Sequence, residues 1–213
     1  MNLAAMQAML GRIYDTPVRY PIEDFLLTDR SRLPEDSLRA QEQLLVCGDG
    51  DTAYLSLYVD ADVLARLTGG GGPWRLDSGN LADWLTALEG VSHFQYFTYH
   101  AEFDRPVSLL ELELQAEVDK YVSCLEVLRR QSPERIPVEV LPQLFSSHFR
   151  LDPQLSAPVA ERYRAATRGA ACYCGRLDRR LQHERDWSAW LSALRRFYRW
   201  PLSRKLALID SRN

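Results

Sequence analysis

The stretch SLLELELQAEVDKYVSCLEVLRRQ, residues 108–131, decides the fold. Its apolar residues recur every three or four positions, which is typical of a helix that buries one face. This stripe consists of Leu110, Leu114, Val118, Tyr121, Leu125 and Leu128. Ser108 and Glu111 fit the Ser-x-x-Glu capping box, in which the serine oxygen accepts a hydrogen bond from a backbone N–H of the first turn. The pattern predicts one long helix over 109–131.

The preceding stretch, NLADWLTALEGVSHFQYFTYHAE at residues 80–102, predicts a second long helix. Leucines occupy one side of this helix, while Phe94 and Phe97 project from the other side. A helix that is apolar nearly all round is usually buried. Only residues 103–107 separate the two helices, and so short a connection, with Pro106 in it, makes the chain reverse. We expect an antiparallel pair of helices in mutual contact.

A β-hairpin is predicted for residues 42–59, EQLLVCGDGDTAYLSLYV, because apolar and polar residues alternate on both arms. Asp49-Gly50 suits a two-residue type I′ turn, whose central positions need positive φ angles. A turn at these two residues places Leu44 opposite Leu55. A lone hairpin is marginally stable in water, so this one is expected to pack on helices or to pair with further strands.

The rest of the chain completes a mostly α-helical α+β fold. Residues 136–140 are the candidate third strand, although this range fits a helix equally well. Further helical patterns cover residues 2–14, 60–68, 158–185, 187–198 and 204–209. The predicted architecture is an N-terminal β-hairpin or small sheet packed on a bundle of long antiparallel helices.

The run Gly69–Gly72, followed by Pro73, marks the most flexible point of the sequence. It divides the chain into a small α/β region over 1–68, a glycine-rich linker over 69–76 and a helical region over 77–213. The alternative is one continuous domain. No Gly-Lys-Ser/Thr follows the glycines, so we interpret them as a surface linker and not as a phosphate-binding loop.

The first candidate site is a metal centre between the two long helices. Glu89, His93 and His100 lie on one face of the first helix, and Glu117 lies at the edge of the apolar stripe of the second. Imidazole and carboxylate groups suit a divalent transition metal, which would make the protein a metal-dependent enzyme. The spacing typical of di-iron bundles and of His-Glu-x-x-His zinc sites is absent. The alternative is a buried hydrogen-bonded pair, His93 with Glu117 or Glu89, that fixes the helix register. We predict no cofactor other than this metal.

The second candidate site is a basic surface. Basic residues are almost all arginine, 24 against 2 lysines, and their distribution is uneven. Residues 1–155 carry a net charge of −11, whereas residues 156–213 carry +8. On the helix predicted at 158–185, arginines gather on the side opposite the apolar face. The basic surface consists of Arg164, Arg168, Arg176, Arg179 and Arg180.

We interpret this surface as the working part of a binding or scaffold protein that has no catalytic machinery identifiable from the sequence. Its expected partner is another protein or a second copy of the chain. Alternatively, acids from residues 1–155, such as Asp119 or Glu126, cover the arginines. A third alternative is nucleic-acid binding, because the following segment interleaves arginine with aromatic residues.

Several classes of protein are excluded by the sequence. No apolar run approaches the roughly 20 residues that a membrane helix needs. The first residues, MNLAAMQAMLGRIYD, lack the basic region and the cleavage site of a secretory signal. Four cysteines are too few for a disulfide scaffold. We therefore expect a soluble cytoplasmic protein without membrane association.

Overall fold

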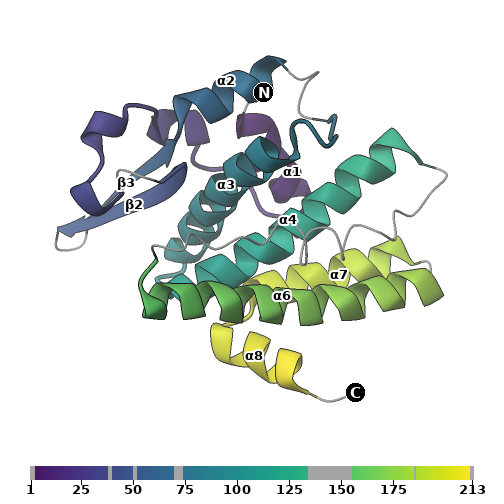
Figure 1. Ribbon diagram of the computed structural model, residues 1–213. Coiled ribbons are helices and arrows are strands. Elements are labelled where there is room, and N and C mark those ends of the chain that lie inside the picture. Colours follow the sequence, from purple (N-terminus) through teal and green to yellow (C-terminus); the bar gives the residue numbers. More distant parts are fainter. Residues whose placement is uncertain are drawn as a thin grey trace.

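The computed structural model describes residues 3–37, 40–49, 52–69, 74–133, 155–184 and 186–211. Most of this part of the chain is helical, and a small sheet lies at one side of the helices (Figure 1). The helices are α1 (Leu3–Tyr14), α2 (Ala61–Gly69), α3 (Leu81–Ala101), α4 (Leu109–Gln131), α6 (Ala157–Glu184), α7 (Trp187–Arg199) and α8 (Leu202–Asp210). The strands are β1 (Leu26–Leu27), β2 (Glu42–Asp49) and β3 (Thr52–Val59). The predicted fold class, α+β and mostly helical, is confirmed.

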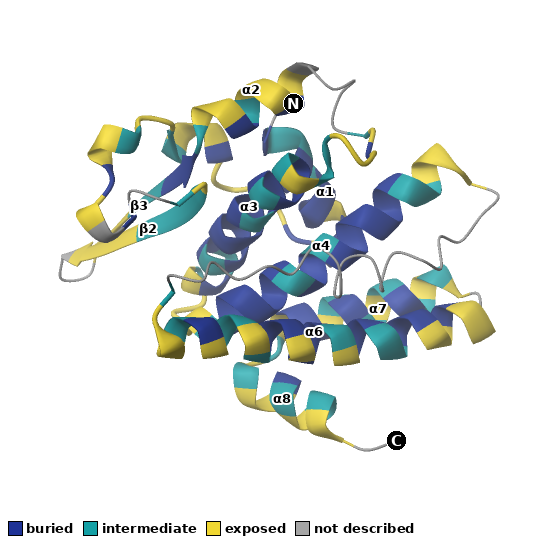
Figure 2. Ribbon diagram, viewed as in Figure 1, coloured by how far each residue is buried: buried dark blue, intermediate teal, exposed yellow. Residues whose placement is uncertain are grey.

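The central element is α4, which packs between α3 on one side and α6 on the other. Figure 2 shows α4 buried along most of its length, as expected for a helix covered on two faces. Its first turn is capped as predicted, since the Ser108 hydroxyl accepts a hydrogen bond of 3.2 Å from the backbone N–H of Glu111. The short connection after α3 reverses the chain, and the two helices form the predicted antiparallel pair.

The sheet has the strand order β1-β3-β2, with β2 antiparallel and β1 parallel to β3. The predicted hairpin is confirmed, but its register is different: Leu44 lies opposite Leu57 and not opposite Leu55. The physical reason is that Asp49 pairs with Thr52 and so belongs to the strand instead of the turn. The connection is therefore displaced by one residue, to positions 50–51, which lie outside the described residues.

The third strand of the sheet is β1, in a segment for which the sequence analysis predicts no strand. The candidate third strand at 136–140 lies outside the described residues. The base of the hairpin is buried against the helices, since Leu57 and Val59 are fully inaccessible. Toward the tip, Val46 and Tyr54 are exposed (Figure 2).

One hydrophobic core joins the sheet, α1 and the long helices. It contains residues from both sides of the predicted linker, for example Val63 before it and Trp84 after it. Positions 70–73 of the linker lie outside the described residues, and the division into domains stays a prediction.

The helix α8 docks through a buried amine, that of Lys205. Its Nζ donates hydrogen bonds to the hydroxyl of Tyr96, at 2.7 Å, and to Oε1 of Gln115, at 2.9 Å. The carboxylate of Glu111 is 3.9 Å away, and the aromatic ring of Phe197 faces the amine. Burial lowers the pKa of Lys205 to about 7, although Glu111 acts in the opposite direction. A neutral amine has two N–H groups, which matches the two acceptors at this position.

Candidate metal centre

The candidate centre is built around His93, which lies on α3 with only 7% of its surface exposed. Its Nδ1 faces Oε2 of Glu42 on β2 at 3.6 Å, and its Nε2 faces Oε2 of Glu113 on α4, also at 3.6 Å. Gly90 lies three residues before His93 in α3, and because it has no side chain it allows β2 to come close. A Cβ there would lie 3.1 Å from the Glu42 carboxylate and 3.1 Å from Leu57. The ring of His93 thus lies between two carboxylates, one from β2 and one from α4.

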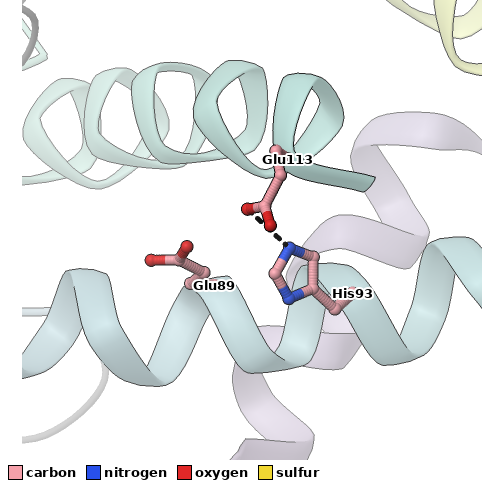
Figure 3. Close-up of side chains that lie close together, drawn as sticks. All are labelled: Glu89, His93 and Glu113. Carbon is pink, nitrogen blue, oxygen red and sulfur yellow. Dashed lines mark ion pairs between the residues drawn. The ribbon is translucent and has the colours of Figure 1, made fainter. Parts of the chain in front are cut away.

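Glu89 completes the cluster from the preceding turn of α3. Figure 3 shows Glu89 and His93 side by side on one helix, with Glu113 reaching toward the ring from the facing helix α4. One ligand atom from each of these three residues lies within 4.8 Å of the other two. The group therefore offers one imidazole nitrogen and two carboxylates from two helices.

Two buried atoms of this site lack a hydrogen bond to any described residue. His93 Nε2 and Glu42 Oε2 are both buried and have no hydrogen-bond partner within the described ranges. The 3.6 Å from Nε2 to Glu113 is too long for a hydrogen bond. It is close to the separation of about 3.3 Å between two ligands that each lie about 2.0 Å from a tetrahedral metal ion. Buried polar groups are usually paired, so Nε2 of His93 and the carboxylate of Glu113 can still take up a further bond at this spacing.

The charge of the cluster also favours the binding of a cation. Lys120 on α4 forms ion pairs of 2.7 Å with Glu89 and with Glu117. Arg162 on α6 lies 3.7 Å from Glu113, and its buried Nε makes no hydrogen bond within the described ranges. The three carboxylates of the cluster, Glu42, Glu89 and Glu113, and the adjoining Glu117 have Lys120 and Arg162 as their permanent cations among the described residues. With a neutral imidazole the net charge is −2, which one divalent cation would balance.

In the metal-free protein, the imidazole itself supplies positive charge. Burial lowers the pKa of His93, but the carboxylates of Glu42 and Glu113 more than offset this and raise it well above the ordinary value. Burial also raises the pKa of Glu42, although the nearby imidazole opposes that shift. The cluster can therefore hold a proton on His93, and a metal ion would displace that proton on binding.

Of the four residues predicted as metal ligands, the structure brings two together. His93 and Glu89 lie in the cluster, whereas Glu117 contacts it only through Lys120. His100 lies elsewhere in the core, where its Nε2 is 3.1 Å from the backbone carbonyl oxygen of Tyr198. Burial and the nearby basic side chains of Arg105, Lys205 and Arg199 lower the pKa of His100 to about 3, so it stays neutral. The pair predicted between His93 and Glu117 does not form.

Two residues of the cluster were not among the predicted ligands. Glu113 lies one turn before Glu117 on α4, so the sequence places it near the same face. Glu42 comes from the hairpin, and no spacing along the chain links it to His93. The glycine in mid-helix at position 90 is the one local signal, because such a residue often marks a close approach by another segment.

One alternative was that acids from residues 1–155 cover the basic surface of α6. The described ion pairs differ from that expectation. Arg168 and Arg164 pair with Glu161, and Arg180 pairs with Glu184, so their partners lie on α6 itself. The structure thus leaves these arginines on an exposed face. The exposed members of the basic surface are Arg164, Arg168, Arg179 and Arg180.

The acids expected to cover these arginines are engaged elsewhere. Asp119 is buried and accepts hydrogen bonds from Tyr14 and from Ser92. Glu126 binds two arginines of its own helix. Arg176, the remaining member of the basic surface, donates hydrogen bonds to backbone carbonyls at the end of α8 and so has a structural role.

Comparison of the chain with protein-family models, with curated proteins and with solved structures found no match. Among the described helices, none combines the length and the apolar character that crossing a bilayer requires. The functional inference therefore depends on the geometry of the sites alone.

Proposed function

We propose that the protein binds one divalent transition-metal ion between α3 and α4, through His93, Glu113 and Glu89. One observation carries this proposal: the buried Nε2 of His93, which has no hydrogen-bond partner among the described residues, lies 3.6 Å from Glu113, and one ligand atom from each of His93, Glu113 and Glu89 lies within 4.8 Å of the other two. One imidazole and two carboxylates form a mixed nitrogen and oxygen donor set, which suits Fe²⁺, Mn²⁺ or Zn²⁺.

Glu42 has a different role in this proposal. It faces Nδ1, the ring nitrogen that points away from Glu113. A histidine ligand usually donates its second N–H to a carboxylate, which fixes the tautomer and the orientation of the ring. Glu42 would be that carboxylate. The ion itself would then be bound by three residues, His93, Glu113 and Glu89.

Three protein ligands are the pattern of a catalytic site and not of a closed structural site, because one position stays open for water or substrate. The side chain of Arg162 beside Glu113 is 25% exposed, so this side of the cluster is near solvent. We therefore propose a metal-dependent enzyme, in which the ion would supply Lewis-acid activation of a bound oxygen.

The test is calorimetric titration of chelator-treated protein with Zn²⁺, Mn²⁺ and Co²⁺. We expect one site per chain for at least one of these ions. His93→Ala and Glu113→Gln should weaken binding about 100-fold or more, and Glu42→Gln about 10- to 100-fold. The matched controls His183→Ala and Glu161→Gln change exposed residues of α6 and should bind as the unchanged protein does. Absence of binding, or equal binding by all variants, would contradict the proposal.

A second candidate function is protein binding through the exposed arginines of α6, in a cytoplasmic protein whose four cysteines are all free thiols. The supporting observation is that Arg164, Arg168 and Arg180 are exposed and that their described ion-pair partners, Glu161 and Glu184, lie on α6 itself. The Arg168→Glu, Arg179→Glu double variant should abolish binding to an acidic polypeptide such as polyglutamate, and binding should weaken with salt. An oligonucleotide is the parallel probe. If it binds and polyglutamate does not, the partner is nucleic acid and this candidate is wrong.

A further inference from the structure

A cavity lies between α1, α4 and α7, apart from the metal centre. It has a volume of about 140 Å³. Its apolar lining comes from Met9 and Ile13 on α1 and from Trp187 and Leu191 on α7. Three arginines and one glutamate complete the lining, and these are Arg12, Arg129, Arg130 and Glu126. The cavity thus combines an apolar surface with a concentration of positive charge.

Tryptophan rings hold the three guanidinium groups in place. Arg129 stacks over Trp187, with its Cζ 4.8 Å from the ring centroid. Arg130 and Arg12 both stack over Trp74, at 4.4 and 5.5 Å. Packing on a ring occupies a face of the guanidinium group and leaves its N–H edge able to donate, although Arg129 and Arg130 already use part of theirs on Glu126. Two like charges are therefore fixed against one ring.

The positive charge of the arginines in the cavity exceeds the negative charge of the acid that lines it. Among the described residues of the lining Glu126 is the one acid, and it already accepts hydrogen bonds from Arg129 and from Arg130. The guanidinium of Arg12 makes no ion pair and no hydrogen bond with the part of the chain that the structure describes. The lining has a net charge of +2 as a result.

We propose that this cavity binds a small phosphate monoester with an apolar body. A phosphate monoester carries nearly two negative charges at neutral pH, which balances the excess in the lining. Arginine edges match phosphate oxygens in a bidentate geometry, so the phosphate would lie between Arg12 and Arg130. The apolar body would contact Ile13, Leu191 and the ring of Trp187. The volume admits a small molecule and is too small for a folded partner.

The probe for this proposal is phenyl phosphate. Inorganic phosphate, which has the phosphate group alone, and phenol, which has the ring without the phosphate, are the comparators. Calorimetry on the full chain is expected to show one binding site for phenyl phosphate. Inorganic phosphate should bind at least tenfold more weakly, and phenol should not bind detectably. Equal binding of phenyl phosphate and inorganic phosphate would overturn the apolar part of the proposal, and absence of binding would overturn all of it.

Arg12→Gln is the decisive variant. Arg12 is exposed and forms no ion pair with any described residue, so the variant should fold as the unchanged protein does. We expect at least a tenfold loss of affinity for phenyl phosphate, while Arg164→Gln on the surface of α6 should bind normally. Unchanged affinity in Arg12→Gln would show that phenyl phosphate binds elsewhere, and the proposal would be wrong. Because neither variant touches the metal centre, metal binding should persist in both.

Discussion

Replacing Leu125 with Ala should lower the free energy of unfolding by about 2–5 kcal/mol, because it removes a leucine from a fully packed site. Leu125 is 1% exposed on the central helix α4. The matched control is Leu109→Ala on the same helix, where the leucine is 59% exposed and the loss should stay below about 0.5 kcal/mol. Denaturation with urea measures both. Equal losses in the two variants would mean that the buried face of α4 is wrongly assigned.

The second large effect concerns the pH dependence of stability, through Lys205. Burial lowers its pKa from 10.5 to about 7 in the folded protein, with Glu111, Arg105 and Asp119 as the charged groups around it. Below pH 7 both the folded and the unfolded states hold the proton, so the cost of the buried charge is fully present. Between pH 7 and 10.5 the folded state loses the proton while the unfolded state keeps it. The free energy of unfolding therefore rises with pH in this window.

We expect Lys205→Met to lose this rise. Over pH 7 to 9, the contribution of Lys205 should amount to about 1 kcal/mol per pH unit. The difference in unfolding free energy between the variant and the unchanged protein should change by that amount, since all other titrating groups are common to both. Arg204→Met, which alters the exposed neighbour, should keep the rise. If Lys205→Met shows the same pH dependence as the unchanged protein, the amine is not titrating in this range.

The helices could be predicted because their signals are local. The apolar stripe and the capping serine of α4 lie within a few residues of each other, and the observed helix has the predicted bounds of 109–131. The last helix, expected at 204–209, begins earlier at Leu202, directly after Pro201. A proline suits the position before a first turn, so that signal is also local.

The register of the hairpin could not be predicted with the same accuracy. Asp49-Gly50 is a good turn sequence, but in the structure Asp49 pairs with Thr52, so the first strand gains one residue and the second begins one residue later. The choice depends on the base of the hairpin, where burial of Leu57 and Val59 against the helices favours one pairing over the other. That contribution comes from tertiary contacts, which the turn residues do not encode.

The candidate metal centre was predictable in half of its residues for a similar reason. Glu89 and His93 are four residues apart on one helix, a spacing that brings them together. The choice of Glu113 over Glu117 depends on how α4 is rotated between α3 and α6, which is decided by packing. Glu42 enters through the docking of the hairpin on α3 and has no signal in the spacing of the sequence.

The most direct test of the metal centre is a crystal of the protein grown with Zn²⁺ and measured on both sides of the zinc absorption edge. We expect one anomalous difference peak per chain, about 2.0–2.1 Å from Nε2 of His93 and at a similar distance from carboxylate oxygens of Glu113 and Glu89. Glu42 should remain on Nδ1 without contacting the ion. A map with zinc bound only at surface residues, and with the imidazole still 3.6 Å from both Glu42 and Glu113, would contradict the proposed function.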